Sequence, residues 1–326
     1  MALVKDGRLV VNRKTVISLI VIVLVIIGLT MVAISMTAPK KAEVVVPSGV
    51  SGLYGVSSGK IYYRVGRSLI AKPVKGKGLE TITNQLNTAV VSPDNTELFY
   101  RTMINYVIDG YKLKLDAQDS TKFAKITDNV WCGLNLYIVS EQGPSSYIVK
   151  DTKGTTYFQN VPTSELYCLG DDLAYNASGS LAESEDDGTL TLKYLSKSKG
   201  DAVIEIGLQN SPLLQNNKEL SYLNTEGSLV LTSGLKDTVL PLRVSNAITT
   251  QYSSGEMYIV DSPSTEETGV DLHRVDLLNK NFAKVASYKT TDNIQQNKAD
   301  IDSNVAFEYE NYLYFMVRNS IVRVEL

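Results

Sequence analysis

The chain has 326 residues, with 32 Lys and Arg against 35 Asp and Glu and a net charge of −3. This acidity, without a dense cluster of Lys and Arg, argues against a nucleic-acid partner, because phosphate binding depends on clustered cations that release counterions. The length exceeds that of one ordinary domain, although large all-β domains also reach this size. Long amphipathic helical patterns are absent, so we expect a mostly β protein.

Residues 15–36 are predicted to form a transmembrane α-helix. Thr15 to Ser35 is a run of 21 residues without a charge, long enough to span the hydrocarbon core of a bilayer, which is roughly 30 Å thick. Residues 1–14 have a net charge of +3, which leaves −6 for residues 15–326. By the positive-inside rule, residues 1–14 form a cytoplasmic tail and the C-terminal part is extracytoplasmic, as in a single-pass cell-membrane protein.

A cleaved signal peptide is the alternative for this segment. The sequence "AIS" at residues 33–35 resembles a cleavage site, but the apolar part of a signal peptide usually has only about 7–15 residues. We therefore predict an uncleaved signal anchor. Residues 37–48 would then be a linker and closing strand, and residues 49–326 the extracytoplasmic domain.

A short sequence motif, a turn followed by a strand of apolar and aromatic residues, occurs seven times after the predicted anchor. "SSGKIYYRV" (57–65) and "SPDNTELFYRT" (92–102) are two of the copies. One tyrosine marks each copy, and successive markers are 36 to 56 residues apart: Tyr62, Tyr100, Tyr137, Tyr175, Tyr222, Tyr258 and Tyr314. A period near 40 residues is typical of a four-stranded propeller blade.

A second strand with alternating apolar and polar residues follows each copy, as in "SLIAKPV" (68–74) and "SIVRVEL" (320–326). The triplets "VGR" (65–67), "IDG" (108–110) and "TEG" (225–227) are expected to form the turns between these strands. The sequence thus predicts a β-propeller of about seven, six to eight, four-stranded blades. "KAEVVVPSGV" (41–50) supplies an early strand that would complete the last blade and close the ring.

The phrase "SPDNTELFY" resembles the repeats of the exported propeller protein TolB, with Asn95 where that family usually has Gly. The pattern of two successive strands in "GKIYYRV…SLIAKPV" is similar to that in bacterial single-pass membrane proteins with a propeller of the low-density lipoprotein receptor type. These proteins are mostly of unknown function. The resemblance covers residues 50–326, implies the propeller fold, and transfers no functional residue.

Cys132 and Cys168 lie in the predicted extracytoplasmic part, 36 residues apart and near corresponding positions of adjacent repeats. A disulfide is chemically permitted there, and two free thiols are the alternative.

No catalytic, cofactor or metal residues are predicted. His273, the one histidine, is expected on the surface or between blades. The acidic run "ESEDDG" (183–188) suits a solvated hairpin tip, and "ADIDSN" (299–304) lacks the Gly and Glu of a calcium loop. Five aspartates fall near the ends of predicted inner strands, where propeller glycosidases place their acids: Asp94, Asp128, Asp171, Asp172 and Asp302. Turn formation accounts for each of them equally well.

The sequence therefore favours a non-enzymatic binding or scaffolding module, which the predicted helix anchors in the membrane. Its partner would be an exported protein or a cell-envelope polymer. The alternative is a cell-envelope glycosidase or lyase that uses carboxylates in the propeller funnel.

Overall fold

The computed structural model describes residues 3–5, 8–10, 20–25, 40–41, 43–117, 119–177, 189–196, 202–207, 214–216, 219–224, 226, 228–233, 236–243, 247–249, 256–261, 269–276, 281–289, 306–317 and 319–326. The chain divides into two compact units, Met1–Lys40 and Lys41–Leu326.

The first unit contains the antiparallel pair β1 (Leu3–Lys5) and β2 (Arg8–Val10). Residues 20–25 are helical and exposed. They belong to the predicted membrane segment 15–36, whose other residues lie outside the described part of the chain. In the part that is described, no helix combines the length and the apolar content needed to cross a bilayer. Strand β3 (Lys40–Lys41) lies at the boundary between the units.

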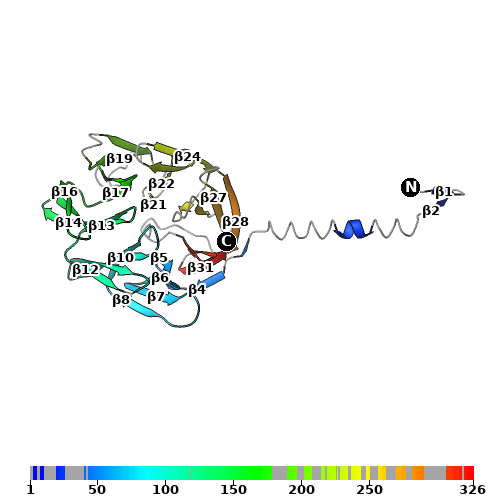
Figure 1. The fold of residues 1–326 in the computed structure, drawn as a ribbon, viewed down its shortest axis with the longest axis horizontal. Coiled ribbons are helices and arrows are strands. Elements are labelled where there is room, and N and C mark those ends of the chain that lie inside the picture. Colours follow the sequence, from blue (N-terminus) through cyan, green and yellow to red (C-terminus); the bar gives the residue numbers. More distant parts are fainter. Residues whose placement is uncertain are drawn as a thin grey trace. The chain divides into compact units, whose positions relative to one another are not determined.

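The described strands of the second unit form seven antiparallel sheets, here called blades 1 to 7 (Figure 1). Blade 1 contains β5 (Gly52–Ser57), β6 (Lys60–Val65), β7 (Ser68–Pro73) and β8 (Glu80–Thr83). Blade 2 contains β9 (Leu86–Val91), β10 (Glu97–Ile104), β11 (Val107–Lys114) and β12 (Ser120–Phe123). Blade 3 contains β13 (Asp128–Cys132), β14 (Asn135–Gly143), β15 (Ser146–Asp151) and β16 (Thr156–Val161).

Blade 4 contains β17 (Leu166–Leu169), β18 (Asp172–Asn176), β19 (Thr189–Tyr194) and β20 (Val203–Gly207). Blade 5 contains β21 (Leu214–Asn216), β22 (Glu219–Leu223), β23 (Ser228–Ser233) and β24 (Lys236–Arg243). Blade 6 contains β25 (Ala247–Thr249), β26 (Glu256–Asp261), β27 (Gly269–Asp276) and β28 (Asn281–Lys289). Blade 7 contains β29 (Phe307–Tyr309), β30 (Tyr312–Val317), β31 (Ser320–Glu325) and β4 (Glu43–Val46).

Neighbouring blades meet through their first strands, since β29 contacts β5, β5 contacts β9, and β13 contacts β17. The blades follow one another around a central axis in chain order (Figure 1). This is the architecture of a β-propeller. The repeat prediction is confirmed, because every marker tyrosine lies on the second strand of a blade and the alternating segment that follows it is the third strand.

Strand β4 closes the ring, as the sequence predicts. It pairs antiparallel with β31, where Val46 lies opposite Ile321 and Glu43 opposite Arg323. The guanidinium of Arg323 donates to Glu43 Oε2 from Nη2 at 2.9 Å and from Nε at 3.0 Å. A strand from the beginning of the unit therefore supplies the outer edge of blade 7.

Tyrosines connect adjacent blades, which accounts for part of the high Tyr content. The Tyr62 hydroxyl in blade 1 donates to the carbonyl of Leu115, between β11 and β12 of blade 2, at 3.4 Å. The N–H of Gly59 in blade 1 donates to the hydroxyl of Tyr309 in blade 7 at 2.8 Å. Burial, together with the charge of Glu80, raises the pKa of Tyr62 to about 12. These phenols are structural.

One turn prediction is wrong. The triplet "IDG" (108–110) lies inside β11, and the turn before this strand is Asn105-Tyr106. Glycine is present at position 110 for packing, because a Cβ there would lie 2.4 Å from Phe99 Cζ and 2.6 Å from Ile126 Cδ1. The triplet "VGR" does form the predicted turn, where Val65 pairs with Ser68.

Candidate functional site

One face of the ring gathers polar contacts between blades. Because the strands are antiparallel, the first strand of a blade begins at the same end where the hairpin between the second and third strands turns. In blade 2, Leu86 begins the first strand and residues 104–107 form this hairpin. We call the face made by these ends the rim face. Among the described residues, arginines on this face donate to backbone carbonyls of the next blade: Arg64 Nη1 to Asn87 O, Arg67 Nη2 to Met103 O, and Arg101 Nη1 to Thr127 O.

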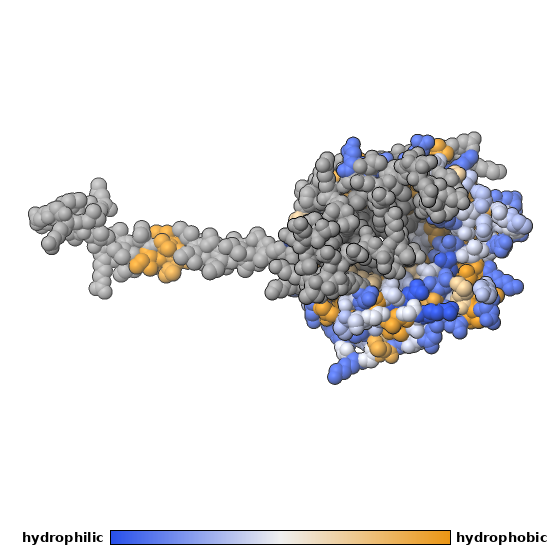
Figure 2. Space-filling model, turned by 180° about the vertical axis from the view of Figure 1, so that it is seen from behind, coloured by the Kyte–Doolittle hydropathy of each residue, from blue (hydrophilic) through white to orange (hydrophobic). Residues whose placement is uncertain are grey.

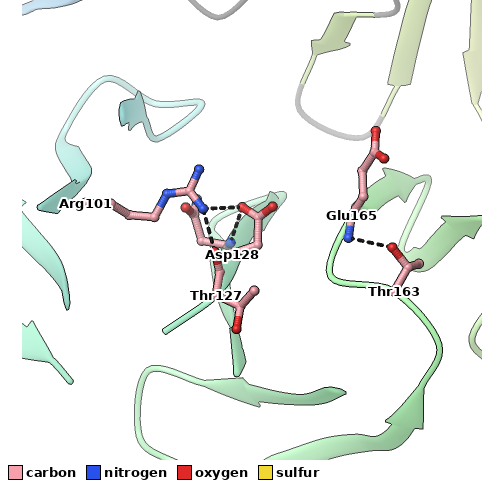
Figure 3. A network of polar contacts seen from close by, with 6 residues as sticks. Arg101, Thr127, Asp128, Thr163 and Glu165 are labelled. Carbon is pink, nitrogen blue, oxygen red and sulfur yellow. Dashed lines mark hydrogen bonds and ion pairs between the residues drawn. The ribbon is translucent and has the colours of Figure 1, made fainter. Parts of the chain in front are cut away.

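Arg101 and Asp128 form the centre of a polar cluster on this face (Figure 3). Arg101 Nη1 lies 3.0 Å from Asp128 Oδ1 and 2.8 Å from the carbonyl oxygen of Thr127. Asp128 Oδ1 also accepts the N–H of Asn129 at 2.7 Å. Both side chains are partly buried, 17% and 32% exposed. The pair fastens blade 2 to the first strand of blade 3.

Glu165 and Tyr167, at the start of blade 4, form a second bonded pair on the rim face, and we call the two pairs together the rim cluster. The N–H of Glu165 donates to Thr163 Oγ1 at 3.2 Å (Figure 3), and the Tyr167 hydroxyl donates to Glu165 Oε1. Burial raises the pKa of Tyr167 well above its ordinary value. The hydrogen bond to Glu165 and the negative charges of Glu165 and Asp128 raise it further.

The chemistry open to this cluster is limited. Tyr167 stays protonated at neutral pH, because every influence on its pKa favours the phenol, so it cannot act as a general base there. Asp128 is engaged with a guanidinium and a backbone N–H. The Arg101–Asp128 pair links blade 2 to blade 3, and the Tyr167–Glu165 hydrogen bond lies within the segment that begins blade 4.

The structure does not gather the predicted aspartates. Asp94 lies in the turn between β9 and β10, and Asp171 and Asp172 lie at the turn between β17 and β18. Asp128 instead begins β13, the first strand of blade 3, and so lies on the rim face, at the other end of the blades from these turns. Asp302 lies outside the described residues, as do the acidic run 183–188 and the segment 299–304.

Asp94 illustrates the turn role. Its Oδ1 accepts hydrogen bonds from Ser92 Oγ at 2.6 Å, Thr96 Oγ1 at 2.9 Å and Thr96 N at 3.2 Å. Asn95 has a φ of +57°, the conformation that Gly or Asn adopts most readily. The "SPDN" segment is therefore a tight turn built by its own side chains.

Cys132 and Cys168 are joined in a disulfide, with their Cα atoms 5.2 Å apart. It connects the first strands of blades 3 and 4, near the ends opposite the rim face. His273 is half-buried on β27, opposite Ile259 and Lys284. Among the described residues, no group of three or more His, Cys, Asp and Glu is placed to bind a metal ion.

No known protein family matches the sequence, and no curated relative does. Solved structures do resemble the fold. An uncharacterized protein from Listeria monocytogenes has a TM-score of 0.54 at 11% identity, with 86% of this chain and 91% of that one covered. The β-propeller domain of the Trilobed protease from Pyrococcus furiosus has a TM-score of 0.51 at 11% identity, covering 84% and 95%.

An oligogalacturonate lyase in complex with manganese has a TM-score of 0.52 at 12% identity, with 89% of this chain and 97% of that one covered. At such identities the likeness establishes the fold alone. The chain is an all-β protein of antiparallel sheets arranged as a propeller, an architecture that enzymes and non-enzymes share.

Proposed function

We propose that the protein is a membrane-anchored, extracytoplasmic propeller that binds an exported protein or an envelope polymer and catalyses no reaction. One observation supports this most directly. Asp128 is bonded to Arg101 and Glu165 accepts from Tyr167, and the predicted funnel acids that the structure describes are divided between the two ends of the blades. Such an arrangement serves a rigid binding surface better than acid–base chemistry.

The location rests on the sequence and on the disulfide. The 21-residue uncharged segment and the +3 charge before it favour a signal anchor with an exported propeller. A disulfide between blades is stable in an oxidising compartment, which agrees with export. The resemblance to TolB-like and single-pass exported propellers supports the same location.

Two experiments test the proposal. Protease treatment of intact cells or spheroplasts should remove the propeller and leave residues 1–14 protected. Crosslinking and affinity capture of the full-length protein in its native membrane should recover a defined envelope component. A control variant with Arg and Lys placed inside residues 15–36 should lose both the location and the capture.

The enzyme alternative predicts a different result. Purified full-length protein incubated with envelope and plant-type polysaccharides would release reducing ends or unsaturated sugars. Asp128→Asn and Glu165→Gln would remove that release if the rim carboxylates were responsible. Cleavage of any polysaccharide at enzymatic rates would overturn the binding proposal.

A further inference from the structure

The hairpin between β10 and β11 has an unusual tip. Ile104 pairs with Val107, so Asn105 and Tyr106 form a two-residue turn, and their φ values are +49° and +65°. Two positive φ values are characteristic of a type I′ turn, whose second residue is most often Gly. Asn tolerates this conformation, but a bulky aromatic residue is an outlier in it. The backbone would accept Gly at position 106 more readily than Tyr.

Packing does not explain the tyrosine. Tyr106 is 96% exposed, so its ring contributes nothing to the core. Ile104 and Val107 beside it are 50% and 46% exposed. A strained backbone that presents an aromatic ring to solvent between two exposed aliphatic side chains points to a contact surface.

The base of the hairpin is fixed on both sides. The carbonyl of Met103 accepts from Arg67 Nη2 in blade 1 at 3.2 Å, and the Met103 N–H donates to Gln85 O at 3.1 Å. On the other side the Lys125 N–H donates to Asp109 Oδ1 at 3.0 Å. The tip is thus preorganised, which reduces the entropy lost when a partner binds.

The charges beside the tip are positive. Arg67 and Lys125 are exposed on its two sides, whereas the nearby acid Asp109 is neutralised by Lys122, whose Nζ lies 2.7 Å from Asp109 Oδ2. This positive surface stands out in a chain whose net charge is −3. On the face drawn in Figure 2, hydrophobic and hydrophilic residues of the described part are interspersed.

We propose that this tip, Ile104 to Val107 with Arg67 and Lys125, docks a peptide segment of an exported protein that combines acidic and apolar side chains. The proposal rests on the proposed binding function and adds the face and the chemistry of the partner. Tyr and Arg are the residue types enriched at protein interfaces. The two exposed aliphatic side chains favour a protein over an anionic glycan, which has few apolar groups to bury against them.

The probe is a library of random short peptides, selected in parallel against full-length wild-type protein and Tyr106→Gly in lipid nanodiscs. Peptides selected on the wild type should be rich in Asp, Glu and apolar residues. Their affinity should fall by about tenfold or more for Tyr106→Gly, as for an interface anchor residue. Arg67→Glu combined with Lys125→Glu should have a similar effect. Peptides without acidic residues, or equal binding to Tyr106→Gly, would overturn the proposal.

Two controls separate binding from folding. Tyr106→Gly relieves the positive φ, so its unfolding temperature should equal or exceed that of the wild type while binding is lost. Leu134, 68% exposed in the turn between β13 and β14 at the other end of its blade, is the matched surface position. Leu134→Ser should leave peptide affinity unchanged, and a loss equal to that of Tyr106→Gly would count against a specific tip.

A photocrosslinking residue at position 106 or 134 of the full-length protein in its native membrane gives the second readout. Crosslinks to an acidic segment of one protein from position 106 alone support the proposal. Crosslinks from position 106 to lipid or glycan refute it. If the captured partner contacts only other blades, the tip proposal fails while the binding function stands, and polysaccharide cleavage would instead refute the binding function itself.

Discussion

Gly110 gives the most quantitative prediction of the structure. In Gly110→Ala the new Cβ would lie 2.4 Å from Phe99 Cζ and 2.6 Å from Ile126 Cδ1. Neither neighbour can easily move away, since Phe99 is fully buried and Ile126 is 5% exposed. Overpacking of this kind costs about 1–3 kcal/mol. A loss of about 2 kcal/mol lowers the unfolding temperature of a domain of roughly this size by about 4–8 °C.

The assay is thermal unfolding followed by circular dichroism, with Gly143→Ala as control. Gly143, the last residue of β14, likewise has no positive φ, and a Cβ there would meet nothing within 4 Å. The control should unfold within about 1 °C of the wild type. Gly110→Ala should cost less in a Phe99→Leu background, because the clashing ring is gone. An unchanged unfolding temperature for Gly110→Ala alone would refute the packing argument.

Three further predictions concern the turn, the ring closure and the disulfide. Partial burial acts to raise the pKa of Asp94, but hydrogen bonds from Ser92 and Thr96 lower it below its ordinary value. Ionised Asp94 therefore stabilises the folded domain at pH values above the pKa of this carboxyl in the unfolded chain, and this stabilisation is lost as the pH falls through its folded pKa. In Asp94→Ala the unfolding temperature should fall less on acidification than in the wild type. Identical profiles of unfolding temperature against pH for the two proteins would contradict this. Val46→Asp buries a charge in β4, at a position 6% exposed, and should cost at least about 2 kcal/mol in denaturant unfolding. The cost should be larger than that of Val44→Asp, two residues away on the same strand, where the side chain is 44% exposed. Reduction of Cys132–Cys168, which closes a loop of 36 residues, should destabilise the domain by about 3–4 kcal/mol in the chain-entropy estimate, and a Cys132→Ser/Cys168→Ser variant should be insensitive to reductant.

The repeat could be predicted because its determinants are local. Alternating side chains on the second and third strands of each blade set which face is buried, and Tyr62 and Tyr314 are indeed almost completely buried. The turn at Asn95 follows from the preference of Asn for positive φ. Closure by β4 could be predicted because an unpaired outer strand needs a partner.

The rim cluster could not be predicted in the same way. Arg101 and Asp128 are 27 residues apart on different blades, and their contact depends on how the blades are rotated against each other. Only Asp128 was singled out by the sequence; Arg101, Glu165 and Tyr167 have no local motif. The error at "IDG" has a related cause, since glycine at position 110 is required by the side chains of Phe99 on the neighbouring strand β10 and of Ile126 in the segment between blades 2 and 3.

The pairing of β4 with β31 also sets the order of events during synthesis. Glu43–Val46 is made early and Ser320–Glu325 late, so β4 must wait unpaired while the other blades are translated and, on the export proposed above, translocated. Such a long-range contact makes ring closure the slowest step of a fold built from local hairpins. Throughout that interval the edge of β4 can pair with a neighbouring chain, so a periplasmic or surface chaperone that covers short β-edges would raise the yield of folded protein.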